Sequence, residues 1–367
     1  MIFKKGEFFN GPGGIALGAK MAKIVDKNGI EYGITHEWSN DIDESACKTF
    51  IHNICPDRSE TVINQDVRDL NIDVLSEIDA FTFGFPCNDY SIVGEKKGLA
   101  GNYGPLYTYG VKVLRKFRPK WFIAENVSGL TSANDGKAFN LIMRDLVESG
   151  YEVTPHLYKF QDYGIPQTRH RIIIVGIRKD LGLKFKVPAP THGENRLPYK
   201  TARQALTEPP IGHDAFNHEL TRHTAKVIEF LNHIPPGENA WYDGIPEHLR
   251  LNVKGAKMSQ IYRRLHPEYP AYTVTGSGGG GTHIYHWNES RALTNRERAR
   301  LQTFPDDFIF LGGKEKVRQQ IGMAVPPEGA RIIIEAILKT FAGINYDSID
   351  SKWNVEELLS QDKLELV

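Results

Sequence analysis

In the first half of the chain, short apolar runs alternate with helical segments, and the links between them are short. Strands are expected at residues 6–10, 32–36, 61–64, 80–85 and 121–124, helices at 15–25, 106–117 and 139–149, and two later strands at 151–159 and 171–177. Such alternation is typical of an α/β fold in which helices cover both faces of a mainly parallel sheet. We therefore predict a doubly wound, mostly parallel sheet with late antiparallel strands.

This alternation stops near Val187, where proline and alanine alternate. Residues 188–287 are rich in proline, glycine, histidine and tyrosine and contain the run Gly276-Ser-Gly-Gly-Gly-Gly281. Helical periodicity then returns, and Thr294 with Glu297 fits a capping box at a helix start. We expect a first domain at 1–187, an inserted, irregular smaller domain at 188–287, and a C-terminal segment at 288–367 that returns to the first domain.

The composition indicates a globular protein with neither a membrane segment nor a disulfide framework. The 367 residues are 40% hydrophobic, enough to bury a sizeable core, and no apolar run reaches the length of a membrane-spanning helix. Three cysteines at uneven spacing suit a reducing compartment. Because the amino terminus also lacks a signal-peptide pattern, we expect a cytoplasmic protein that contacts no membrane. The cysteine and histidine spacings indicate no metal site.

Basic residues are concentrated in one segment, although the net charge at pH 7 is zero. Between Leu249 and Arg300 there are nine lysines and arginines and three acids. Such a segment can contact the phosphates of a nucleic acid. A solvated helix face is the alternative, and charge alone does not decide between the two.

Pro86 and Cys87 directly follow the apolar run that should form the fourth strand. In open α/β sheets, ligands bind beyond the carboxyl ends of the strands, so this thiol would lie at the edge that carries the chemistry. Ser91 lies four residues further on, and the segment 94–104 contains two lysines that could lower the thiol pKa. Cys87 is therefore a candidate nucleophile, with inert core packing as the common alternative for a free cysteine.

A glycine-rich turn, Phe9-Asn-Gly-Pro-Gly-Gly14, joins the first expected strand to the first helix. Such a turn lets the backbone approach a cofactor, and the helix N-terminus favours negative or polar groups. Glu37 is placed where an acid would bind ribose hydroxyls, and Asp66 where one would accept from an adenine amino group. Together these residues indicate an adenosine cofactor. A nicotinamide dinucleotide is the alternative, but the three glycines are closer together than in its fingerprint.

Polar residues also follow the fifth strand and begin the last expected strand. Glu125 ends the fifth strand, so its carboxylate would face Cys87 across one pocket, although an ion pair or a helix cap is the commoner role of such an acid. Arg169 and Arg171 alternate on an extended segment, so both side chains would point to one side. Two guanidinium groups on one face can clamp a carbonyl, a phosphate or a carboxylate, with surface ion pairing as the alternative.

Taken in this order, the segments resemble the motifs of the DNA (cytosine-5) methyltransferase family. The matching motifs are Phe9-x-Gly-x-Gly-Gly14, Pro86-Cys87-x-x-x-Ser91, Glu125-Asn126-Val127, Gln167-x-Arg169-x-Arg171, Arg291-x-Leu-Thr-x-Arg-Glu297 with Leu301-Gln302-x-Phe-Pro305, and Gln320-Ile-Gly-Met-Ala-Val-Pro-Pro327. The resemblance implies the Rossmann-like fold of S-adenosylmethionine-dependent methyltransferases, with the middle segment as a target-recognition domain. It also implies site-specific methylation of cytosine at carbon 5 in double-stranded DNA.

The resemblance further implies roles for individual residues. The catalytic residues would be Cys87, which adds to carbon 6 of the base, together with Glu125, Arg169 and Arg171. Residues implied to bind S-adenosylmethionine are Phe9, Gly11, Pro12, Gly13, Gly14, Glu37, Trp38, Asp66, Val67, Pro86, Leu106, Met323 and Ala324. Residues implied to bind DNA are Ser91, Asn126, Arg263, Arg264, Thr273, Gly278 and Gly279.

One position departs from the family pattern, because Met323 stands where an asparagine is usual. Its thioether is only a weak acceptor. The helix expected at 328–341 should pack beside the helix that follows Gly14. The resemblance also implies a prokaryotic restriction–modification setting with a cognate endonuclease, and we expect a monomer. The alternatives are an RNA (tRNA) cytosine-5 methyltransferase of the same family and a catalytically silent DNA-binding paralogue.

Overall fold

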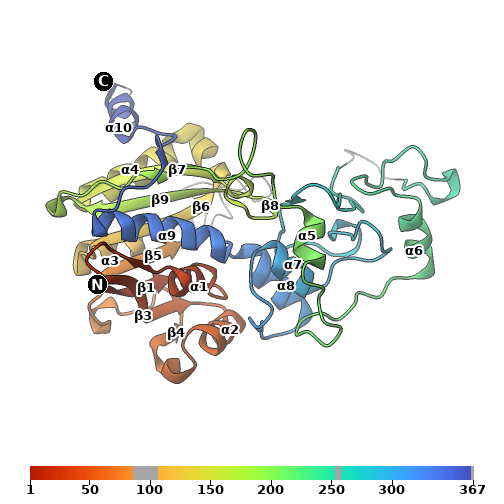
Figure 1. The fold of residues 1–367 in the computed structure, drawn as a ribbon, viewed down its shortest axis with the longest axis horizontal. Coiled ribbons are helices and arrows are strands. Elements are labelled where there is room, and N and C mark those ends of the chain that lie inside the picture. Colours follow the sequence, from red (N-terminus) through yellow and green to blue (C-terminus); the bar gives the residue numbers. More distant parts are fainter. Residues whose placement is uncertain (86–105, 253–257, 365–367) are drawn as a thin grey trace. The chain divides into compact units, whose positions relative to one another are not determined.

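The computed structural model describes residues 1–85, 106–252 and 258–364, and Figure 1 shows its fold. Contacts between residues divide the chain into two compact units. The first comprises Met1–Lys159, His170–Ala189 and Pro327–Val367, and the second comprises Phe160–Arg169 and Pro190–Pro326. Within the described ranges, every helix is too short or too polar to cross a bilayer.

The first unit is built on one sheet in which most neighbouring strands are parallel. Its strands are β1 (Ile2–Phe8), β2 (Ile24–Val25), β3 (Glu31–Asp41), β4 (Val62–Asn64), β5 (Ala80–Gly84), β6 (Trp121–Val127), β7 (Tyr151–Lys159) and β9 (His170–Arg178). Their order is β2-β3-β1-β5-β6-β9-β7, and β4 also pairs with β3. The late strand β9 runs antiparallel to β6 and β7, and the short β2 runs antiparallel to β3. The predicted doubly wound, mostly parallel sheet is confirmed.

Helices cover both faces of this sheet (Figure 1). They are α1 (Gly14–Met21), α2 (Glu44–Ile54), α3 (Tyr107–Phe117), α4 (Lys137–Glu148), α9 (Pro327–Ala342) and α10 (Val355–Leu364). As expected, α1 packs against α9, and on the other face α3 packs against α4. The first contact requires a residue without a side chain: a Cβ on Gly18 would lie 2.5 Å from the carbonyl oxygen of Pro327 and 2.6 Å from Cβ of Ala330. A short antiparallel pair, β10 (Val187–Pro188) with β12 (Ser348–Ile349), completes the unit.

An aromatic core holds the central strands in place. Phe81 and Phe83 of β5 are 0% and 1% exposed and stack with ring centroids 5.1 Å apart. Phe8 of β1 packs edge-on against Phe81, and Phe122 of β6 packs against Phe83. Because alternate residues of a strand share one face, these rings lie in one layer between the sheet and its helices. The carboxyl end of β5, at Gly84, is therefore fixed by packing on both neighbouring strands.

Three elements differ clearly from the expected bounds. The first strand, β1, spans Ile2–Phe8 rather than residues 6–10, because Ile2–Lys5 already pair with β3. The first helix ends at Met21 rather than at position 25, because Ile24 and Val25 form β2 and pair with β3. The second strand of the alternation, β3, continues to Asp41 instead of ending at His36. Its pairing with β1 shifts register at this point, and this shift leaves Glu37 as the extra residue of a bulge.

The second unit contains little regular structure. Its helices are α5 (Ala202–Thr207), α6 (Ala225–Asn232), α7 (Asn295–Leu301) and α8 (Lys314–Met323), and its only described strands, β8 (Gln167–Thr168) and β11 (Ala271–Tyr272), form a parallel pair. A small core around Phe230, Leu231 and Tyr285 supports α6. The predicted capping box at the start of α7 is confirmed, since Glu297 N donates to Thr294 Oγ1 and Thr294 N donates to Glu297 Oε2.

The second unit is larger than the expected inserted domain at 188–287. Residues 288–326, expected to rejoin the first domain, belong to it, and so do residues 160–169. The physical reason is local packing. Helix α7 packs against α8, and the buried amide of Gln167 donates to the carbonyl of Leu301 and to Oε1 of Gln302.

Candidate active site

The turn after β1 is held in a conformation that exposes its backbone. Phe9, Gly11 and Gly13 have φ angles of 56°, 50° and 100°, in the left-handed region that glycine tolerates best. A Cβ placed on Gly11 would meet no described atom within 4 Å, so this side of the turn is open. Helix α1 starts at Gly14, and no described side chain caps it. Pro12 lies between Gly11 and Gly13 in this turn. The open side of the turn and the uncapped N-terminus of α1 can therefore both contact a ligand.

Asp41 anchors this turn from the carboxyl end of β3. Its Oδ2 accepts from Gly11 N at 2.8 Å, and its Oδ1 accepts from Asp43 N at 2.9 Å. Burial raises the pKa of this carboxyl above its ordinary value, and the two hydrogen bonds oppose the rise. The next residue, Ile42, is 68% exposed. An acid beside a glycine turn is suited to ribose hydroxyls, and an exposed isoleucine next to it is suited to the face of an adenine ring.

Glu37 and Trp38, expected to bind the cofactor, do not end this strand. Glu37 occupies the bulge, four residues before Asp41. Trp38 is 3% exposed and donates from its indole nitrogen to the carbonyl of Ser76 at 2.9 Å. Its ring packs against Phe8 in the aromatic core. The prediction that placed Glu37 at the strand end is therefore wrong, and Trp38 is a core residue.

The remaining expected cofactor residues of the first unit follow β4 or precede α3. Asp66 forms an ion pair with Arg68 at 2.6 Å, and this hydrogen-bonded arginine lowers the pKa of the Asp66 carboxyl. Val67 is 3% exposed and packs in the aromatic core. Leu106, 8% exposed, immediately precedes α3. Pro86 lies outside the described residues.

Asn10, within the glycine turn, carries an unsatisfied acceptor. The residue is 4% exposed, and its Nδ2 donates to the carbonyl of Gly11. Its Oδ1 is buried and has no hydrogen-bond partner among the described residues. Buried polar atoms are rarely left unpaired, so a bound group is a natural partner. The open side of the turn, the Asp41 carboxylate and this acceptor together fit an adenosine cofactor.

Glu125 and Arg171 form an ion pair at the carboxyl end of β6. Arg171 Nε lies 2.9 Å from Glu125 Oε1, and the two side chains are 13% and 12% exposed. Glu125 is in register with Gly84 at the end of β5, and a Cβ on Gly84 would lie 3.1 Å from Glu125 Oε2. The Glu125 carboxylate therefore lies over Gly84, two residues before Pro86 in the sequence. Cys87 and Ser91 lie outside the described residues.

Asn126, expected to contact DNA, is buried instead. The side chain is 1% exposed; Nδ2 donates to the carbonyl of Phe85 at 3.3 Å, and Oδ1 accepts from Val127 N at 2.8 Å. Phe85 is the last described residue before the segment with Cys87. Asn126 thus holds the backbone that leads into this segment, and it does not present its amide to a ligand.

Arg169 and Arg171 do not point to one side, as the alternation predicted. Arg169 is 0% exposed, and its guanidinium donates at 2.9 Å to the carbonyls of Val274, Gly322 and Ala324. All these partners belong to the second unit. Three carbonyl partners and complete burial fit a positioning residue that joins three loops, whereas Arg171 has the Glu125 carboxylate as its partner.

Of the two arginines expected at the DNA, Arg264 is buried. It is 6% exposed, and its guanidinium donates to the carbonyls of Leu231, Ile234, His286 and Glu289. This arginine ties the core of the second unit together, so the prediction of a DNA contact is wrong. Arg263 is half-buried, and its guanidinium lies over the ring of Tyr272 at 4.7 Å.

The other expected contact residues of the second unit lie in two places. Thr273 donates from Oγ1 to the carbonyl of Thr168 at 2.6 Å, and Gly278 and Gly279 form an open turn, with Gly279 exposed. Met323 ends α8 and is 66% exposed, whereas Ala324 is 6% exposed. The carbonyl of Ala324 is engaged by Arg169.

Sequence reasoning missed Asp41, Ile42 and Asn10. A signal for the first two exists in the sequence: Asp43 directly precedes a helical segment, and the structure shows Asp43 capping α2 by accepting from the N–H groups of Ser45 and Ala46. An N-cap at position 43 places the end of the preceding strand at positions 41 and 42. For Asn10, no pattern indicates an unpaired oxygen, because its burial depends on the surrounding strands.

Comparison with known proteins gives one consistent family. The family model of the C-5 cytosine-specific DNA methylases matches residues 3–339. A Type II methyltransferase of Brevibacillus brevis, M.BbvI, is 64% identical over 375 residues, covering 100% of this chain and 99% of that protein. The Type II methyltransferase M.NgoFVII of Neisseria gonorrhoeae is 40% identical over 97% of this chain and 92% of its own length.

Solved structures agree with this fold. A putative DNA modification methyltransferase encoded within a prophage of E. coli superposes with a TM-score of 0.71 at 22% identity, over 92% of this chain and 99% of its own. A mutant of the DNMT2 protein of Spodoptera frugiperda superposes with a TM-score of 0.60 at 14% identity, over 91% and 99%. At these identities the similarity establishes the fold.

Proposed function

The chain belongs to the C-5 cytosine-specific DNA methylase family, and from this premise we propose that it methylates carbon 5 of a cytosine within a specific site of double-stranded DNA. The observation that carries the proposal is the Glu125–Arg171 pair at the end of β6, beside the strand end that leads to Pro86 and Cys87. This arrangement supplies a carboxylate and a guanidinium to one edge of a base, and β5 leads in sequence to the candidate nucleophile.

Three residues, each with its own role, act on the base. The Cys87 thiolate adds to carbon 6, which forms a sulfur–carbon bond and moves an electron pair toward carbon 5. Glu125 hydrogen-bonds or protonates ring nitrogen 3, so that the added charge is accommodated there. Arg171 donates to the carbonyl oxygen at position 2. Once carbon 5 carries the methyl group, loss of its proton and cleavage of the sulfur–carbon bond restore the ring and release Cys87 as a thiolate.

The cofactor that this family uses is S-adenosylmethionine, which supplies a methyl group activated by its sulfonium. The residues that fit it are the open turn around Gly11, the carboxylate of Asp41 and the exposed side chain of Ile42. Asn10 Oδ1 adds a buried acceptor. Asp41 takes the ribose-binding role that the sequence pattern had placed at Glu37.

The target cytosine must leave the helix, because carbon 6 is not accessible inside stacked DNA. The second unit, with its basic segment and its irregular loops around Arg263 and Gly279, supplies the contacts to the duplex. Two relatives with matching lengths are named Type II methyltransferases. Their names support pairing with a restriction endonuclease, and we place the enzyme in the cytoplasm as a monomer.

Covalent trapping tests the proposal. Bacterial DNA with part of its cytosine replaced by 5-fluorocytosine should give an adduct that survives denaturation, since fluorine cannot leave as a proton does. The adduct should require S-adenosylmethionine and should not form with Cys87→Ala. A parallel reaction with tRNA that contains 5-fluorocytosine tests the RNA alternative. Trapping on tRNA alone, or equal trapping by the alanine variant, would reject the proposal, and binding of DNA without any trapping would indicate the silent paralogue.

A further inference from the structure

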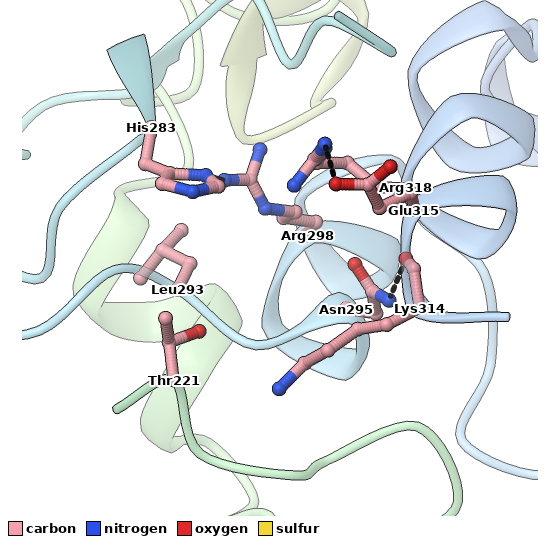
Figure 2. A pocket seen from close by; sticks show the side chains of 8 residues that line it. All are labelled: Thr221, His283, Leu293, Asn295, Arg298, Lys314, Glu315 and Arg318. Atoms are coloured by element: carbon pink, nitrogen blue, oxygen red, sulfur yellow. Dashed lines mark hydrogen bonds and ion pairs between the residues drawn. The ribbon is translucent and has the colours of Figure 1, made fainter. Parts of the chain in front are cut away.

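A cavity of about 140 Å³ lies between α7 and α8 in the second unit. Figure 2 shows three basic side chains around it: Arg298 from α7, and Lys314 and Arg318 from α8. His283 and Asn295 complete much of the wall, and Glu315 is the acid that lines it. The cavity therefore has more cationic than anionic groups, and none of its lining residues was assigned to the candidate active site.

Arg298 is the unusual residue in this cavity. It is 2% exposed, and its guanidinium has one described side-chain or backbone partner, the Nδ1 atom of His283 at 3.4 Å. Neighbouring buried arginines are fully engaged: Arg296, for example, donates to the carbonyls of Phe216, Pro305 and Phe308. A buried guanidinium is costly unless it is paired and hydrogen-bonded. Arg298 thus has donors to spare toward the cavity.

Arg318 adds a second incompletely paired guanidinium. Its ion pair with Glu315 is long, at 3.8 Å, and the Glu315 side chain is 89% exposed. Its Nε is buried and lacks a hydrogen-bond partner among the described residues. In Figure 2 the side chain of Arg298 extends between His283 and Arg318. The two guanidinium groups outweigh the single exposed carboxylate of Glu315, so the net charge of the side chains around the cavity is positive.

The electrostatics of the site agree with this geometry. Burial, with repulsion from Arg318 as the next cause, lowers the pKa of Arg298 to about 10. Burial and the nearby arginines lower the pKa of His283 to about 4, so its ring is neutral at pH 7 and accepts from Arg298. At neutral pH Arg298 therefore keeps its charge, and an anion in the cavity would relieve its repulsion from Arg318.

Helix α8 adds a further attraction for an anion. The helix begins at Lys314, and no described side chain caps it at Gly313. The first residues of this helix, Lys314 and Glu315, line the cavity. The positive end of the helix dipole and an exposed ammonium group thus lie at the same place as the two guanidinium groups.

We propose that this cavity binds a phosphate group through Arg298, Arg318 and Lys314. Planar guanidinium groups match the oxygen pairs of phosphate, and a lysine adds a point charge. The phosphate is either a phosphodiester of the DNA backbone or free inorganic phosphate, since both present the same oxygens. In either case the anion supplies the acceptors for the Arg298 donors that do not face His283.

Thermal unfolding in inorganic phosphate tests the site directly. A ligand that binds only the folded protein raises the unfolding midpoint as its concentration rises. We expect the wild-type midpoint to rise in phosphate above that in chloride of equal ionic strength, and Arg318→Gln to lose this rise. Glu315→Gln should enlarge it, because the competing carboxylate is removed. Lys226→Gln, an exposed lysine of α6, is the matched control and should behave as wild type.

DNA binding distinguishes the two sources of phosphate. One phosphate contact contributes about 0.9 to the slope of log Kd against log salt concentration. A slope reduced by roughly this amount in Arg318→Gln, and also in the exposed variant Lys314→Gln, identifies a backbone phosphodiester. A lost phosphate response with an unchanged slope identifies free phosphate. If phosphate raises no midpoint and both variants keep the wild-type slope, the proposal is overturned; Lys314→Gln decides the matter should Arg318→Gln fail to fold.

Discussion

Arg171 on β9 pairs with Glu125 on β6 at 2.9 Å, and both side chains are nearly buried. The two strands are antiparallel neighbours, and Arg171 is in register with Val127, two residues beyond Glu125. The antiparallel β9 therefore brings an arginine to the edge at which parallel strands of this sheet end. This geometry allows one carboxylate and one guanidinium to meet the same planar ligand.

Replacing Glu125 by glutamine should remove the acid while keeping the shape. General acid–base groups typically contribute about 10²- to 10⁴-fold, so we expect single-turnover methyl transfer to slow by roughly that factor, with DNA affinity changed only slightly. Glu152→Gln on β7, a half-exposed acid paired with Lys184, is the control and should react at the wild-type rate. Equal rates for Glu125→Gln and wild type would remove Glu125 from the mechanism.

The corrected cofactor site makes a separate prediction about Asp41. Hydrogen bonds to charged groups contribute about 1.5–3 kcal/mol, so Asp41→Asn should weaken S-adenosylmethionine binding by roughly 10- to 100-fold. Glu37→Gln should leave the affinity unchanged. Calorimetric titration of both variants measures this. The opposite ranking, with Glu37→Gln weaker than Asp41→Asn, would mean that the bulge residue binds the cofactor after all.

Adding a side chain at Gly18 should separate α1 from α9. A Cβ at this position would come within 2.6 Å of Pro327 O and of Ala330 Cβ, and overpacking typically costs about 1–3 kcal/mol. Gly18→Val should therefore lower the free energy of unfolding in urea by about that amount. Lys20→Ala, at an exposed position on the same helix, should change it by less than about 0.5 kcal/mol. Equal stability of the two variants would contradict the close contact.

Acid should destabilise the first unit partly through His36. Burial, with repulsion from Lys5 and Arg58, lowers the pKa of this ring from 6.5 to about 3. Between these values the unfolded chain binds a proton and the folded chain does not, so stability is present above pH 6.5 and is lost as the pH falls. His36→Gln should reduce the loss between pH 7 and pH 5 by about 1–2 kcal/mol. Urea titrations of both proteins at the two pH values measure it, and identical losses would refute this assignment.

The order of strands and helices could be predicted because it follows from hydrophobic periodicity and short links. The end of β3 could not, because Ser39 and Asn40 are polar yet buried within the strand. Asn40 Nδ2 donates to the carbonyls of Ile63 and Gln65, so a neighbouring strand satisfies it. This polar pair lies inside the strand instead of ending it, and the expected cofactor acid was consequently placed four residues too early.

The roles of arginines were equally hard to predict from sequence. Arg263 and Arg264 are adjacent and equally basic in sequence, but carbonyls from four separate positions converge on Arg264 alone. The same holds for Arg169, whose three carbonyl partners lie more than a hundred residues away. Charge in a sequence predicts a surface contact by default, whereas convergence of backbone acceptors depends on tertiary structure. Glu125 was predictable because it directly follows an apolar strand.

The central claim is that this chain methylates cytosine at a specific DNA site through Cys87. Conversion sequencing of DNA from a host that lacks cytosine methylation and expresses the protein tests it most directly. We predict one recurrent sequence in which a single cytosine is protected in nearly every copy, and no protection with Cys87→Ala. Unprotected cytosines in the presence of folded wild-type protein, or the same protected sequence with Cys87→Ala, would contradict the claim.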